Sequence, residues 1–264
     1  MTALAFLFGL LTGSFLNVCI YRLPKDESVV RPRSRCPHCG HPIRWYDNIP
    51  VVSFLLLGGR CRDCRAALSL VYPAVELATG LLFALVVSRF GLTLASAKYA
   101  ALVSMMLILG TADLFDRLLP DQVTLGGAAA GVVLSLIRPL DPGLVSLLLG
   151  LWGIRLGPVT ASALESVTGA AAASGMLYLV AEIYYRVRFR EGMGLGDVKM
   201  MALIGAFLGL GPAIWVVMVA SVMGAALGLV FIVVFRKGMQ YELPFGTFLA
   251  LAGILWVVWR NETA

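Results

Sequence analysis

Residues 93–116 read TLASAKYAALVSMMLILGTADLFD, and this stretch decides the class of fold. Its apolar part, residues 93–112, carries one charged side chain and is long enough to cross a bilayer core of ~30 Å as a helix. Two acids, Asp113 and Asp116, stand at the end of this run. An ionisable group at a membrane border is costly, so we expect it to have a function.

The composition of the whole chain also indicates a membrane protein. Of its 264 residues, 59% are hydrophobic and 14% are charged, whereas a soluble domain carries about 25% charged residues. Sustained apolar runs predict eight spans, at residues 3–21, 71–88, 93–112, 121–137, 162–185, 197–210, 212–235 and 243–259. Residues 143–154 are apolar but too short to cross, so we expect them to be interfacial or re-entrant. The predicted fold class is an all-α polytopic membrane protein with about eight transmembrane helices.

The basic residues predict how the chain lies in the membrane. The net charge of +6 would allow a nucleic-acid partner, but nine of the 21 Lys and Arg residues fall in one polar loop, residues 22–69. Placing this loop in the cytoplasm puts seven more basic residues there, so that 16 of 21 obey the positive-inside rule. Those seven are Arg117, Arg186, Arg188, Arg190, Lys199, Arg236 and Lys237. We therefore expect no nucleic-acid partner, both termini outside the cytoplasm, and a first span that is retained.

Four cysteines in the 22–69 loop form a candidate metal site. Cys36 and Cys39 make one C-x2-C pair, Cys61 and Cys64 make another, and 21 residues separate the pairs. This spacing is close to that of tetrathiolate zinc sites, and a reducing cytoplasm favours metal over disulfides. The alternatives are unliganded thiols or redox activity. Cys19, inside the first span, is expected to be a packing residue.

A second acidic motif lies far along the chain at Gly194-Leu195-Gly196-Asp197. The glycines, together with Gly192, permit positive φ and close approach of a substrate strand. Asp197 is expected at a helix N-terminus, where helix capping is the structural alternative to catalysis. The topology puts Asp197 in the same leaflet as the Asp113 and Asp116 pair, although spacing does not decide which of those two points inward. Two carboxylates at one depth indicate an aspartyl hydrolase.

The chain resembles the bacterial type IV prepilin peptidases nearly from end to end. The resemblance rests on GSFLNV at 13–18, the two cysteine pairs, YPAVEL at 72–77, the seven-residue offset from Asp113 to Pro120, EGMGLGDVK at 191–199 and PFG at 244–246. One departure is Thr247, because many relatives have a second proline at that position. The family resemblance selects Asp113 and Asp197 as the catalytic pair.

The resemblance implies further expectations about activity and location. It implies cleavage of prepilins or pseudopilins after the glycine of a basic leader, N-methylation with S-adenosylmethionine, and residence in the bacterial inner membrane with the active site at the cytoplasmic face. Gly194, Gly196, Lys199 and Glu76 are candidate site-supporting or substrate residues. Glu76 is expected to support packing at the cysteine loop, or to pair with Lys199 or an arginine. The sequence locates no methyl-donor pocket and predicts no oligomeric state.

We expect residues 1–90 to form an N-terminal region that holds the first two spans and the loop, and residues 91–264 to form a six-helix peptidase core. Two other classes of protein remain open at this stage. An ion-coupled transporter also carries intramembrane acids, but it would place them near the midplane. A non-enzymatic pilus or secretion assembly factor would function without either aspartate.

Overall fold

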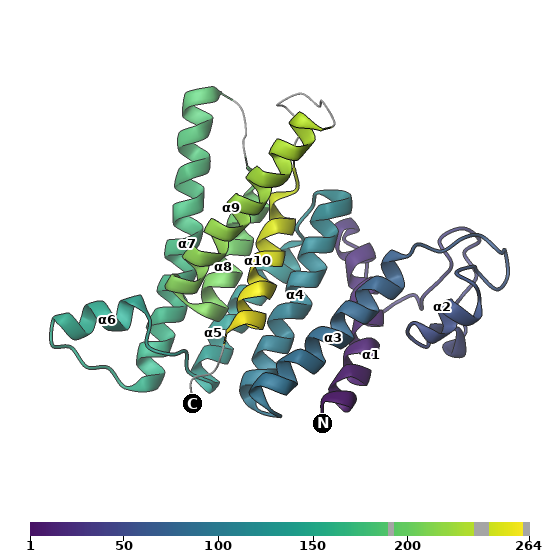
Figure 1. Ribbon diagram of the computed structural model, residues 1–264, viewed down its shortest axis with the longest axis horizontal. Helices are drawn as coiled ribbons and strands as arrows, with labels where there is room; N and C mark the ends of the chain where they lie inside the picture. The colour runs from purple at the N-terminus through teal and green to yellow at the C-terminus, as the bar shows by residue number, and fades with distance from the viewer. Residues whose placement is uncertain (190–192, 235–242, 261–264) are drawn as a thin grey trace. The chain divides into compact units, whose positions relative to one another are not determined.

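The computed structural model describes residues 1–189, 193–234 and 243–260, which form helices and connecting loops (Figure 1). Arg190, Gly192, Arg236 and Lys237, which entered the topology and motif predictions, lie outside these ranges. Within them there is no β-strand, although two isolated bridges occur in the cysteine loop. The predicted all-α class is confirmed.

Each of the eight apolar stretches corresponds to a helix. Five helices are long and apolar enough to cross a membrane: α1 (Thr2–Arg22), α3 (Val71–Phe90), α4 (Leu94–Asp116), α7 (Pro158–Arg188) and α9 (Leu210–Val233). Three are shorter: α5 (Asp121–Ile137), α8 (Leu195–Leu208) and α10 (Phe245–Trp259). The chain is therefore a multi-pass membrane protein.

Short elements fill the connections between these helices. The 22–69 loop contains the 3-10 turns η1 (Leu23–Lys25) and η2 (Trp45–Asn48) and the helix α2 (Val52–Leu56). Residues 143–154 contain α6 (Leu144–Leu151), which projects to the side of α7 in Figure 1. At ~1.5 Å per residue, α6 is too short to cross a bilayer. Its expected interfacial or re-entrant location stays a prediction.

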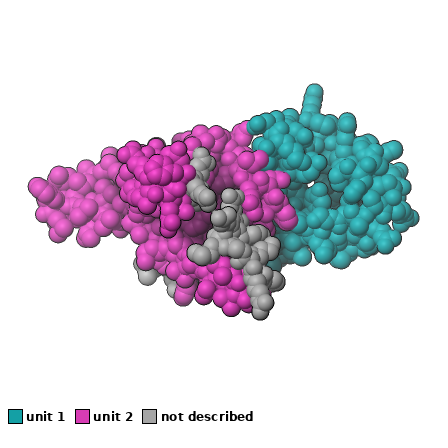
Figure 2. All heavy atoms as spheres, turned by 90° about the horizontal axis from the view of Figure 1, so that it is seen from above, with its two compact units in different colours: residues 1–108, 260–264 teal, residues 109–259 magenta. Residues whose placement is uncertain are grey.

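The chain divides into two compact units, coloured separately in Figure 2. Unit 1 comprises residues 1–108 and 260–264, and unit 2 comprises residues 109–259. The division falls inside α4. The expected functional boundary between residues 90 and 91 stays a prediction.

In unit 1, α1 and α3 pack closely along glycine contacts. A Cβ on Gly9 would lie 2.8 Å from the Cα of Gly80, and one on Gly13 would lie 2.7 Å from the Cα of Glu76. Small residues at such positions let two backbones approach in a membrane, where lipid gives no hydrophobic drive for association. Cys19 is buried in α1, as expected of a packing residue.

In unit 2, α8 is enclosed by α5, α7, α9 and α10. Its side chains Met200, Leu203, Ile204 and Phe207 are fully buried. The backbones of α7 and α8 approach each other at Gly169, where a Cβ would lie 2.7 Å from the carbonyl oxygen of Gly205. Because α8 is surrounded by protein, its short length and its polar first turn do not have to meet lipid.

We expect Gly169→Ala to lower the free energy of unfolding by about 1–3 kcal/mol, because its methyl group overpacks the α7–α8 contact. The matched control is Gly175→Ala in the same helix, where a Cβ would meet nothing within 4 Å. Alanine favours helix there, so the control should be neutral or slightly stabilising. Thermal unfolding of both proteins in detergent measures the difference. Equal unfolding midpoints for the two variants would contradict the close-contact argument.

Candidate active site and metal site

Asp113 lies in the last turn of α4 and is 6% exposed, whereas Asp116 is exposed. The fold thus distinguishes two acids that sequence spacing did not. The backbone N–H of Thr247 in α10 donates a hydrogen bond of 2.7 Å to Asp113 Oδ2. The Thr247 hydroxyl lies 3.1 Å from the same oxygen and 3.0 Å from the carbonyl oxygen of Gly110.

The contact between α4 and α10 depends on Gly110. A Cβ on Gly110 would lie 2.6 Å from the Cβ of Ala250, so only glycine allows these helices to come so close. Close approach brings the first turn of α10 against the last turn of α4. The sequence marks Thr247 only as a departure from a motif and does not reveal its contact with Asp113. The polar residue three positions after Pro244, at a helix start, was the available signal.

Asp197 is the third residue of α8 and is 8% exposed. The expected location at a helix N-terminus is confirmed, but the capping alternative is wrong, because Gly194 is the N-cap and no side chain caps this helix. The expected positive φ is also wrong for Gly194, at −75°, and for Gly196, which is helical. Gly196 instead permits close packing, since a Cβ there would lie 3.0 Å from Leu119 side-chain atoms.

The two acids meet at Gly246 in the first turn of α10. A Cβ on Gly246 would lie 3.0 Å from Asp113 Oδ2 and 3.1 Å from Asp197 Oδ1. Both carboxylates therefore border the same small space, although 84 positions separate them in the sequence. Two buried carboxyl groups this close do not both ionise freely, so the pair can hold one proton between them. Such a pair can activate water on one side and donate a hydrogen bond on the other.

Lys199 forms an ion pair with Asp121 rather than with a member of this acid pair. Its Nζ lies 2.7 and 2.8 Å from the two oxygens of Asp121, the first residue of α5. Asp121 does not cap α5, because Pro120 is the N-cap and no side-chain cap forms. Both partners are partly exposed, so the ion pair adds at most about 1 kcal/mol to stability.

In unit 1, the four loop cysteines come together. Their Sγ atoms all lie within 4.8 Å of one another, and those of Cys36 and Cys64 are 3.8 Å apart. A tetrahedral zinc site with Zn–S bonds of ~2.3 Å requires sulfur atoms about 3.8 Å apart. The donor set therefore fits a tetrathiolate metal site and leaves no open position for catalysis.

The two cysteine turns have matching backbone structures. The N–H of Cys36 bonds to the carbonyl of His41, and the N–H of Cys61 bonds to the carbonyl of Ala66, both at 2.9 Å. The residue after each second cysteine, Gly40 or Arg65, has a positive φ. Although desolvation opposes ionisation of Cys36, hydrogen bonds from Cys39 and His38 lower its pKa to about 6. A thiolate is the form that binds metal.

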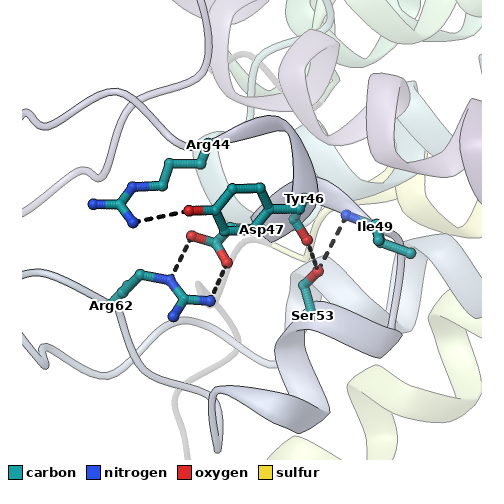
Figure 3. Close-up of polar contacts among 6 residues, drawn as sticks. All are labelled: Arg44, Tyr46, Asp47, Ile49, Ser53 and Arg62. Carbon is teal, nitrogen blue, oxygen red and sulfur yellow. Dashed lines mark hydrogen bonds and ion pairs between the residues drawn. The ribbon is translucent and has the colours of Figure 1, made fainter.

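A polar network joins the second cysteine turn to the segment before α2 (Figure 3). Arg62 donates two hydrogen bonds to Asp47, from Nε at 2.8 Å and from Nη2 at 2.6 Å. These bonds lower the pKa of Asp47. Ser53 of α2 donates to the carbonyl of Tyr46 at 2.7 Å and accepts from the N–H of Ile49 at 3.2 Å, as Figure 3 shows.

Glu76 connects α3 to the same loop. It is 8% exposed, and its Oε2 accepts a 2.8 Å hydrogen bond from the backbone N–H of Val51. Val51 is a non-glycine residue with φ of 62°, a conformation that needs support from its surroundings. Glu76 therefore holds the turn that leads into α2.

We expect the purified chain to contain one zinc ion per molecule and Cys61→Ser to lose most of it, because three thiolates bind the metal more weakly than four. Elemental analysis measures the metal content. Cys19→Ser is the matched control, since Cys19 is buried in α1 and takes no part in the four-sulfur cluster. Equal zinc in the wild type and in Cys61→Ser would rule out a tetrathiolate site.

Two family models match different parts of the chain. Residues 7–90 match the bacterial peptidase A24 N-terminal domain, and residues 100–229 match the type IV leader peptidase family. Proteins named prepilin leader peptidase/N-methyltransferase are similar over most of the chain. The one from Burkholderia pseudomallei is 36% identical over 95% of this chain and 83% of its own length. The one from Pseudomonas aeruginosa is 34% identical over 97% and 89%.

A relative with the same name from Myxococcus xanthus is 39% identical over 85% of this chain. The matched region spans 61% of that longer relative. No solved structure matches the chain.

Proposed function

Since the chain belongs to the type IV leader peptidase family, we propose that it is a membrane aspartyl endopeptidase that removes the leader from prepilins or pseudopilins. It cleaves after the glycine that ends a basic leader, and it then methylates the new N-terminus. The observation that carries this proposal is the pair of buried carboxylates, Asp113 and Asp197, that border one space at Gly246.

In the proposed mechanism, one aspartate removes a proton from water and the other donates a hydrogen bond to the scissile glycyl carbonyl. Water attacks the carbonyl carbon, and the shared proton passes to the leaving amine as the C–N bond breaks. The proton belongs to the pair, so neither role is assigned to one residue. Burial of both groups excludes bulk water and strengthens these interactions.

The proposed substrate explains why the pair lies at helix ends. Asp113 is three residues from the end of α4, and Asp197 is the third residue of α8. The basic residues favour the cytoplasmic side for these ends, with the chain termini on the opposite side. A leader rich in Lys and Arg then stays in the cytoplasm while the pilin helix lies in the bilayer, which puts the scissile bond at the border.

The second activity requires a methyl donor, for which we propose S-adenosylmethionine. When bound, the donor supplies an electrophilic methyl group. The acceptor of that methyl group would be the free amine of the cleaved pilin. Zinc at Cys36, Cys39, Cys61 and Cys64 has a structural role in this proposal, because four thiolates close its coordination shell.

We expect Asp113→Asn and Asp197→Asn each to slow leader removal at least about 100-fold, since positioned acid–base groups contribute about 10²–10⁴-fold. Co-expression with a prepilin, scored by the size of the pilin, measures cleavage. Asp116→Asn is the matched control, because this acid is on the same helix end but exposed. Cleavage that persists in both single variants would reject the aspartyl mechanism.

We also expect Thr247 to act as a positioning residue for Asp113. Thr247→Val keeps the backbone N–H but removes the hydroxyl, and the loss of one hydrogen bond should slow leader removal about 2- to 10-fold. Thr247→Ser restores the hydroxyl and should recover the wild-type rate and pH profile. Initial rates on a purified prepilin at several pH values test this. A Ser variant as slow as Val would show that the methyl group matters, and not the hydroxyl.

A further inference from the structure

A pocket of about 380 Å³ lies within unit 1, between the cysteine loop and the adjoining parts of α1 and α3. All of its lining residues belong to unit 1, so it is not part of the Asp113 and Asp197 site. Its volume is within the range of ~300–1,000 Å³ that small-molecule sites have. The peptidase mechanism does not use it.

Besides Arg22, three polar side chains that line the pocket are more than nine-tenths buried. They are Asn17 of α1, Ser53 of α2 and Glu76 of α3, at 7%, 5% and 8% exposed. Asn17 Nδ2 donates a 3.0 Å hydrogen bond to the carbonyl of Tyr72, and Ser53 bonds within its own segment. These contacts fix the side chains in place, so the pocket is built before any ligand arrives.

The Glu76 carboxylate gives the pocket its chemical character. Its Oε2 accepts a hydrogen bond from the N–H of Val51, while an ionised carboxylate has about four acceptor sites. A buried carboxylate is costly unless a positive group compensates it. Asp47, also in the lining, is already paired with Arg62, which is not in the lining. The Glu76 carboxylate therefore suits a ligand that carries a positive charge.

The rest of the lining suits a ligand with a planar apolar part and an acidic end. Apolar and aromatic side chains form much of the wall, among them Tyr21, Ile43, Phe54, Leu57, Leu68 and Tyr72. Arg35 also lines the pocket and can meet a carboxylate. The guanidinium of Arg22 is held by the carbonyls of Ser28 and Arg33, so it is part of the wall. Acidic residues outnumber basic ones in the lining, which disfavours a nucleoside phosphate.

We propose that this pocket binds S-adenosylmethionine, with the Glu76 carboxylate as the counter-charge of the sulfonium. The inference rests on the methyl transfer proposed above and gives that activity a location. The apolar wall, Asn17 and Ser53 would hold the nucleoside part of the donor, and Arg35 would meet its carboxylate. The peptidase site and the methyl-donor site are then separate, one in each unit.

The test compares two ligands that differ in charge at sulfur. Isothermal titration of the purified, zinc-loaded full chain in detergent measures affinity for S-adenosylmethionine, which is cationic at sulfur, and for S-adenosylhomocysteine, which is neutral there. The wild type should bind both. Glu76→Gln should weaken S-adenosylmethionine at least about tenfold and S-adenosylhomocysteine less than about threefold, since loss of a buried counter-charge affects only the sulfonium.

Two further variants separate an effect on ligand binding from an effect on folding. Glu165→Gln removes another buried glutamate, in α7 of unit 2, and should leave both affinities unchanged. Leu57→Trp fills the pocket and should weaken both ligands together. An unchanged unfolding midpoint shows that a variant is folded. If Glu76→Gln itself does not fold, Leu57→Trp decides the location of the site.

Several results would overturn the proposal. They are no binding by the wild type, equal weakening of both ligands in folded Glu76→Gln, or unchanged affinities in folded Leu57→Trp. The titration contains no pilin, and leader removal, which is scored by the size of the pilin, does not require the methyl donor. Failure of this site would therefore leave the peptidase assignment untouched, and failure of the peptidase assignment would leave the titration valid.

Discussion

The enclosure of α8 by its neighbours is the constraint on which the acid pair of unit 2 depends. A carboxylate in a short helix facing lipid would be strongly destabilising, because hydrocarbon offers it no partner. Glycines at the α7–α8 contact and at the α4–α10 contact remove side-chain volume where the backbones approach. The resulting close packing keeps Asp197 out of lipid and brings the start of α10 against Asp113.

Gly246, unlike these other glycines, borders the two carboxylates and not a contact between helices. There the missing side chain leaves the space that both carboxylates border, and even a methyl group would lie within about 3 Å of each of them. A water molecule about 3 Å from both carboxylates would be within hydrogen-bond distance of each. The location of the pair at helix ends also argues against the transporter alternative, which requires acids near the membrane midplane.

Different interactions stabilise the buried polar groups of the two units. In unit 2 the acids meet each other and the donors of Thr247, which suits proton transfer. In unit 1 the loop is organised by four sulfur atoms, by the Arg62–Asp47 pair and by the bond from Val51 to Glu76. A small loop without a large apolar core depends on such crosslinks for a defined shape.

The sequence by itself determined the helical class, the eight apolar helices, the four-cysteine cluster and the two acidic motifs, because these depend on local hydropathy, on spacing and on residue chemistry. Only the tertiary structure decided that Asp113 is buried and Asp116 exposed, that Lys199 pairs with Asp121, and that Thr247 contacts Asp113. It also showed that Gly194 and Gly196 serve the start of a helix and close packing rather than a left-handed backbone. Those outcomes depend on how far apart helix backbones lie, which glycine contacts between distant segments set and which no periodicity along the chain encodes.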